Sequence, residues 1–139
     1  MLETAEKFIA ELEKNEWKYK DARDLDDGKT HVGCGVTGKT TQVDFHLFFD
    51  QDSHSVSIRA FKLFIVPIDK KLAVMNQMNA INAEYRWVKF FVDGDAWMNL
   101  QTDALINAET AGPVCLELIM RAINIVDEAY PKFMHEIWA

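Results

Sequence analysis

The chain has 139 residues, 49% hydrophobic and 27% charged, which is typical of a globular protein, so we expect one domain over residues 1–139. A formal net charge of −7 argues against nucleic acid or an anionic membrane surface as the binding partner. No stretch approaches the roughly 20 apolar residues of a membrane helix and no signal-peptide core is visible, so a cytoplasmic protein is expected.

The first half of the chain predicts one helix followed by four strands. Apolar residues recur at helical spacing from Leu2 to Leu12. Beyond that point the pattern changes to alternation, which is typical of strands with one buried face. The expected strands are residues 16–23, a second around Val32, Cys34 and Val36, a third over 41–50, and a fourth with Val56, Ile58 and Ala60 inward.

The second half predicts a helix, a hairpin and a further helix. Pro67 suits the first turn of a helix that runs to about Ala83. We expect Leu72, Met75 and Met78 on the apolar side of that helix. The hairpin pairs residues 86–92 with 96–102 across Asp93-Gly94-Asp95, and the last helix stops at Pro131 with a short helix over 132–138 after it.

The expected element order is therefore α-β-β-β-β-α-β-β-α. Runs of strands separated by helices indicate an α+β fold with an antiparallel sheet of about five to six strands and flanking helices.

Residues 33–40 read GCGVTGKT and match the phosphate-binding loop pattern G-x-x-x-x-G-K-[ST]. That loop works at the start of a helix, where backbone N–H groups and the helix dipole face the phosphates. Here the alternating residues 41–50 predict a strand after Lys39. We interpret the motif as a tight hairpin at Thr37-Gly38-Lys39, with Gly38 able to take a positive φ. A nucleotide site at Gly33–Thr40 is the weaker alternative.

Other patterns that could carry chemistry have structural interpretations. His31 and Cys34 are three apart, and on a strand such residues point to opposite faces, so we expect no metal site. The histidines are expected to be solvated, and Cys34 and Cys115 to be core residues. Aspartate clusters at 24–27, 50–52 and 93–95 fit turns. With no nucleophile–base signature, we expect a protein that is not an enzyme and has no cofactor.

One stretch near the middle of the chain resembles a known family. An Asn-x-x-Asn helix end, a Trp/Phe-x-Lys-Phe strand and an Asp-Gly hairpin resemble the YbjN family of bacterial sensory transduction regulators. The resemblance implies a fold like that of type III secretion chaperones, and it does not imply an enzyme. The matching residues here are Asn79, Asn82, Trp87, Lys89, Phe90 and Asp93-Gly94, followed later by Asp127 and Ala129-Tyr130-Pro131.

Asn79 and Asn82 fall at the expected end of the second helix, just before the hairpin. Their amides can satisfy carbonyls at the helix end or backbone groups of the incoming strand. We expect them to be structural caps, with contact to a ligand or partner as the alternative.

The side of the sheet that points away from the helices is predicted to carry aromatic residues. A face with aromatic side chains and scattered polar groups is typical of protein-binding surfaces. The alternative is that the chain's own helices cover it. The last helix is apolar nearly all round, so it needs burial on more than one side, which crossing the sheet or packing in a dimer would provide. The candidate partner-binding residues are Phe48, Phe61, Trp87, Phe91 and Trp97.

These patterns together lead to one hypothesis and two alternatives. The leading hypothesis is a non-enzymatic protein-binding or chaperone-like regulatory module that forms a homodimer. The first alternative is a small-ligand sensor with a pocket between sheet and helices. The second is the nucleotide-binding protein described above.

Overall fold

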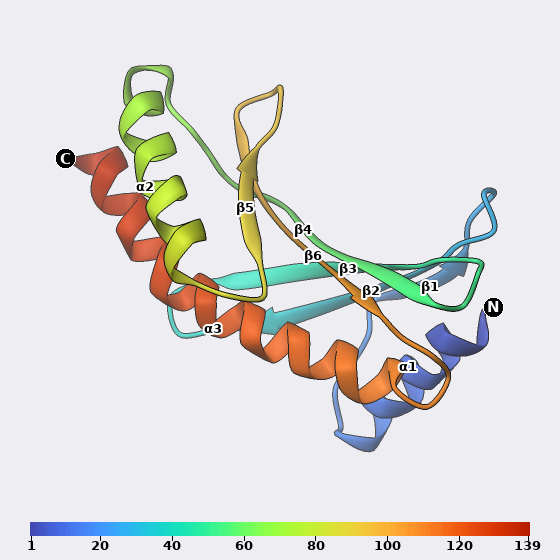
Figure 1. Cartoon of the computed structure of the whole chain (residues 1–139). Helices are drawn as coiled ribbons and strands as arrows, with labels where there is room; N and C mark the ends of the chain where they lie inside the picture. Colours follow the sequence, from blue (N-terminus) through green and yellow to red (C-terminus); the bar gives the residue numbers. More distant parts are fainter.

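The protein is described by a computed structural model that covers every residue from Met1 to Ala139. Its elements confirm the predicted order and the α+β class (Figure 1). In chain order they are α1 (Glu3–Lys14), β1 (Asp21–Asp24), β2 (Thr30–Thr37), β3 (Gln42–Phe49), β4 (Ser55–Ile65), a 3₁₀ turn (Ile68–Lys70), α2 (Lys71–Glu84), β5 (Lys89–Val92), β6 (Trp97–Leu105) and α3 (Ala111–Trp138).

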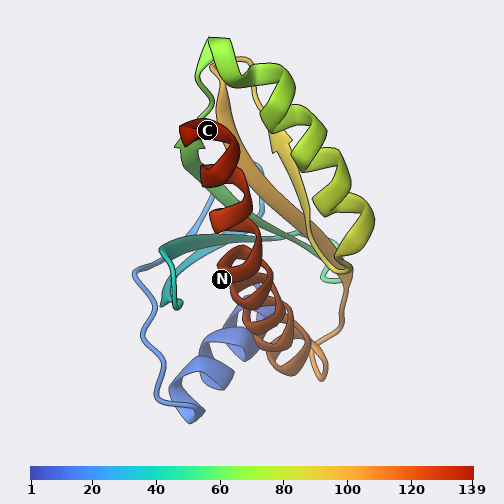
Figure 2. The ribbon, with the colours of Figure 1, turned by 90° about the vertical axis from the view of Figure 1, so that its left-hand side faces the viewer.

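The strands form one antiparallel sheet in the order β1-β2-β3-β4-β6-β5. Figures 1 and 2 show all three helices on one side of this sheet, which leaves the other side without a helix. In β3 the predicted alternation is confirmed, because Val43, Phe45, Leu47 and Phe49 are all buried on the helix side. None of the helices combines the length and apolar character needed to cross a membrane.

The long helix α3 supplies many of the buried residues of the core. It packs against both α1 and α2, and its buried residues lie on several sides of the helix. This contact within the chain explains why the helix is apolar on more than one side.

Helix α3 also corrects a prediction, since it continues through Pro131 to Trp138 without a break. A proline inside a helix removes one N–H and leaves the carbonyl four residues earlier without its partner. Here that carbonyl belongs to Asp127, and it accepts a hydrogen bond of 3.4 Å from the Thr40 hydroxyl. Beyond the proline, the fully buried Phe133 packs on Phe64 and Phe90. Distant contacts therefore hold the last turns in place.

The strand expected over 16–23 is wrong in its first half, because β1 begins at Asp21. Glu16 has a φ of 60°, in the left-handed region, and the Trp17 N–H donates to the Leu12 carbonyl at 2.8 Å. This bond wraps the chain back over the end of α1, as in other left-handed helix ends. Residues 16–20 are consequently a connection and not a strand.

Two expectations around α2 are also wrong. Pro67 precedes a separate 3₁₀ turn, and the α-helix begins only at Lys71. The buried residues of α2 are Val74 and Ile81; of the three expected residues, Met78 packs partly buried against the core, whereas Leu72 is 76% exposed. The helix carries apolar residues on several sides, so periodicity alone did not identify the side that the core would cover.

Candidate functional site

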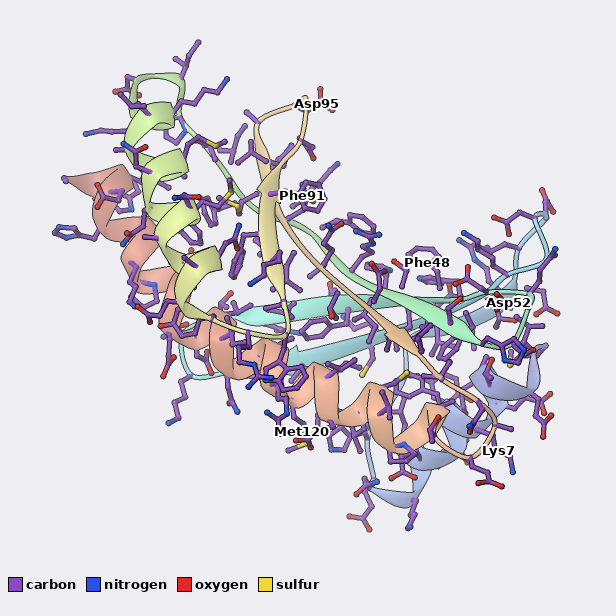
Figure 3. All side chains as sticks on the ribbon, viewed as in Figure 1. Lys7, Phe48, Asp52, Phe91, Asp95 and Met120 are labelled. Atoms are coloured by element: carbon purple, nitrogen blue, oxygen red, sulfur yellow. The ribbon has the colours of Figure 1, made fainter.

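The candidate site is the face of the sheet that points away from the helices, which we call the outer face. Phe48 on β3 and Phe91 on β5 lie on the side of the sheet away from α3 (Figure 3). The strand register places His31 of β2 opposite Phe48, and His46 of β3 opposite Arg59 of β4. Because side chains alternate along each strand, these residues share one face.

Aromatic rings on this face form a continuous row, which we call the aromatic row and define as Phe48, His31, His46 and Phe61. Successive ring centroids lie 5.1, 5.1 and 5.4 Å apart. These separations are within the range of favourable ring–ring contact. Phe61, at the end of the row, is 47% exposed. The row therefore presents a continuous aromatic surface in which the ring of Phe61 is well exposed.

The two histidines in the row belong to a hydrogen-bonded chain. His31 Nδ1 lies 3.1 Å from Asp21 Oδ2, and His31 Nε2 lies 2.9 Å from His46 Nδ1. His31 is only 7% exposed, so the expectation that the histidines are solvated is wrong for it, although it holds for the exposed His54. No group of three or more His, Cys, Asp or Glu is arranged to hold a metal ion.

The surroundings of His46 favour its neutral form. Burial, together with the neighbouring His31, lowers the pKa of His46 from its ordinary value. A lowered pKa means that the unfolded state binds the proton more tightly. The contribution of His46 to stability is therefore complete above the unfolded pKa, about 6.5, and is lost as the pH falls through the folded value.

We expect the urea midpoint of the wild-type protein to fall between pH 7.5 and 5.5, and to fall less in His46→Gln. His54→Gln is the control, because it removes an exposed histidine that lies outside the aromatic row. Urea titrations at a series of pH values measure the effect. An equal fall in the wild type and in His46→Gln would contradict the assignment.

A second cluster stabilises the other end of the outer face. Asn99 is 2% exposed, and its Nδ2 donates to Asp93 Oδ2 at 3.0 Å while its Oδ1 accepts from the Lys62 N–H at 3.0 Å. The bond from Asn99 lowers the pKa of the Asp93 carboxyl. The Lys62 ammonium lies 5.8 Å from the centre of the Trp97 ring. Asn99 thus joins the bulge in β4 to the β5–β6 turn, beside Trp97.

Four of the five candidate binding residues, Phe48, Phe61, Phe91 and Trp97, lie on strands at outward positions, but Trp87 does not. Trp87 has a φ of 77° and precedes β5, which corrects the expectation of a strand from residue 86. Its ring lies 4.8 Å from the guanidinium carbon of Arg86 and 4.9 Å from that of Arg121 on α3. The left-handed residue turns the indole to the helix side, away from the other four.

Asn82 bonds the backbone of β5 at both of its polar groups. Its Oδ1 accepts from the Phe90 N–H at 2.9 Å, and its Nδ2 donates to the Phe90 carbonyl at 3.0 Å. The Lys89 ammonium donates to the carbonyls of Asn82 and Tyr85 at the end of α2, at 2.7 and 2.9 Å. Asn79, the other expected cap, is exposed one turn earlier.

The phosphate-loop residues 33–40 form the last part of β2, up to Thr37, and most of the connection to β3. Strand β3 follows Lys39, as predicted, so no helix begins there. The Thr40 N–H donates to Asp127 Oδ1 on α3 at 3.0 Å. Gly38 does not have the expected positive φ. A larger residue there would crowd the Asp127 carboxylate, because a Cβ at Gly38 would fall too close to Asp127 Oδ1. The motif thus docks the β2–β3 turn onto α3.

Comparison with known proteins agrees with this architecture. Residues 4–135 match the YbjN family, described as "Putative bacterial sensory transduction regulator". The fold is similar to the crystal structure of "YbjN, a putative transcription regulator from E. coli", with a TM-score of 0.60, 14% sequence identity and 91% of each chain covered. No curated protein matches the sequence significantly. At this identity the structural likeness shows the fold alone.

Proposed function

This chain belongs to the YbjN family, and from that membership we propose that it is a non-enzymatic regulatory module that binds another protein through its outer face. The observation that carries the proposal is Phe61, which is 47% exposed at the end of the aromatic row. Exposed aromatic residues on a rigid surface are the usual anchors of protein interfaces.

The polar groups of the outer face support this proposal. The buried ring of His31 and the buried amide of Asn99 are bonded within the protein. A partner that covers them does not leave these groups unpaired, so burial of these two side chains carries little desolvation cost. The rings also contact one another before binding, which reduces the entropy lost on association.

The outer face is also our proposed surface for a homodimer. Helix α3 packs most of its apolar residues against α1, α2 and the sheet, so we place the dimer contact on the outer face and not on this helix. Cys34 and Cys115 are buried and free, which suits the cytoplasmic location that we propose.

A small-ligand sensor is the second candidate, and one observation favours it. A hollow of about 370 Å³ lies on the outer face beside the aromatic row. Asp21, His31 and His46 line it, together with Lys20 and Arg23. This hollow is on the opposite side of the sheet from the helices, whereas the sequence analysis placed a sensor pocket between sheet and helices.

Replacement of Phe61 by Glu is the test of the proposed function. We expect Phe61→Glu to keep the wild-type melting temperature and to lose the partners that the wild-type protein captures from the native cell. Ile68→Glu is the matched control, because Ile68 is an apolar residue with 93% exposure outside the outer face.

Light scattering on the same variants tests the dimer. We expect the wild-type protein and Ile68→Glu to have the mass of a dimer, and Phe61→Glu to have a lower mass, closer to that of the monomer. Equal capture and equal mass in all three proteins would contradict the proposal.

A further inference from the structure

Strand β6 has one edge that is paired over only part of its length. Strand β5 pairs with Met98–Gln101 of β6, whereas β4 pairs with β6 as far as Leu105 on the other side. Residues 102–105 therefore have no neighbouring strand on the β5 side, because the left-handed Trp87 turns the chain away before β5 begins. We call residues 102–105 on this side the free edge.

The backbone groups at the free edge can be assigned from their neighbours. Phe90 bonds Asn82 with its N–H and C=O, so these groups point away from its β6 partner Leu100. The N–H and C=O groups of the residues next to Leu100, Asn99 and Gln101, consequently point towards β5. Because backbone groups alternate in direction along a strand, those of Asp103, two residues after Gln101, point to the same side. In agreement, the Ile106 N–H points the other way and donates to the His54 carbonyl at 2.9 Å. The N–H and C=O of Asp103 thus point outward from the sheet.

An apolar groove of about 690 Å³ runs between the free edge and α3. Thr102 and Ala104 line it from β6, and Val114 and Leu118 line it from α3. The Trp87 ring also lines the groove, and the guanidinium groups of Arg86 and Arg121 both contact it. An unpaired edge beside an apolar groove is the geometry that accepts an added strand, with main-chain bonds for affinity and the groove for alternate side chains.

The charges of the groove indicate what such a strand carries. Asp103 and Glu117 both line the groove, with side chains 67% and 58% exposed, and Asp103 Oδ1 has only a long contact of 3.8 Å with the Arg59 guanidinium on the outer face. The only basic group in the lining is Arg121, which is already paired with Glu117 at 2.9 Å. A second copy of this chain is a poor occupant. Two β6 edges paired about a two-fold axis would bring their Asp103 carboxylates together, and like charges across strands destabilise the pair.

We propose that the free edge of β6 binds an extended segment of a partner protein in which apolar residues alternate with lysine or arginine. The segment adds to the sheet beside β6 and bonds the Asp103 backbone. Its apolar side chains enter the groove towards Val114 and Leu118, and its basic side chains face the Asp103 carboxylate on the other side of the sheet. The inference rests on the proposed protein-binding function but places this contact outside the aromatic row.

The test is an NMR titration of the full chain with a synthetic peptide of about eight residues that alternates valine and lysine, which is within the usual length of a strand. We expect amide shifts confined to residues 102–105 and to the neighbouring part of α3. Asp103→Lys should weaken binding by up to about fivefold, the range for an exposed ion pair. A peptide with glutamate in place of lysine should prefer Asp103→Lys over the wild type.

The Phe61→Glu variant separates this inference from the proposed function. It should bind the valine–lysine peptide as the wild type does, since Phe61 lies on β4 outside the groove. Absence of shifts at residues 102–105 up to about 1 mM peptide, near the weakest affinity worth measuring, overturns the inference. Shifts at the aromatic row also overturn it, as does equal binding of the lysine and glutamate peptides to the wild type and to Asp103→Lys. These outcomes leave the proposed function standing.

Discussion

Phe133→Ala is expected to lower the free energy of unfolding by about 3–5 kcal/mol, the usual cost of removing a buried aromatic ring. Phe133 has no exposed surface, and its ring centre lies 5.3 Å from that of Phe64 and 5.4 Å from that of Phe90. It therefore joins α3 to β4 and β5 from a position just after Pro131. Urea denaturation followed by circular dichroism measures the loss.

Trp138→Ala is the matched control for this prediction. Trp138 lies near the end of the same helix but is 82% exposed, so its replacement should change stability by no more than about 0.5 kcal/mol. Equal effects of the two substitutions would mean that the helix end is not packed on the sheet. The interpretation of Pro131 as a helix terminator would then be restored.

Asn82→Ala is expected to cost about 1–3 kcal/mol, because it leaves partly buried backbone groups of β5 without partners. Both the N–H and the carbonyl of Phe90 lose their bonds to the Asn82 amide. Chemical denaturation of the purified variant measures the loss, and Asn82→Asp should show a smaller one because it keeps the acceptor.

Asn79→Ala is the control, since this exposed residue lies on the same helix, one turn earlier. If the midpoint of Asn82→Ala equals that of Asn79→Ala, then the cap role is wrong. Contact with a ligand or partner would become the better explanation of Asn82.

Regular alternation and helical spacing predicted the order of elements because each depends only on neighbouring residues. Strand β3 is the clearest example, with four alternate positions buried as expected. The errors fall where distant contacts decide the backbone. Glu16 and Trp87 are in the left-handed region without being glycine, so no local pattern predicts them. Pro131 stays inside α3 through a bond from Thr40, 87 residues away from Asp127 in sequence.

The same limit applies to the candidate site. Alternation predicted outward positions for Phe48, Phe61, Phe91 and Trp97, since only the side of each strand mattered. The hydrogen-bonded chain through His31 was missed, because it depends on the register that aligns β1, β2 and β3. Asp, His and His at positions 21, 31 and 46 were visible in the sequence, but their spacing alone does not indicate a contact.

Site-specific cross-linking in the native cell tests the central claim most directly, namely that the outer face binds a protein. A photoreactive phenylalanine analogue would replace Phe61 in one variant and Ile68 in another, both exposed apolar positions. The account predicts a covalent adduct with a discrete protein from position 61 and none from position 68. No adduct at position 61, or the same adduct from both positions, would contradict it.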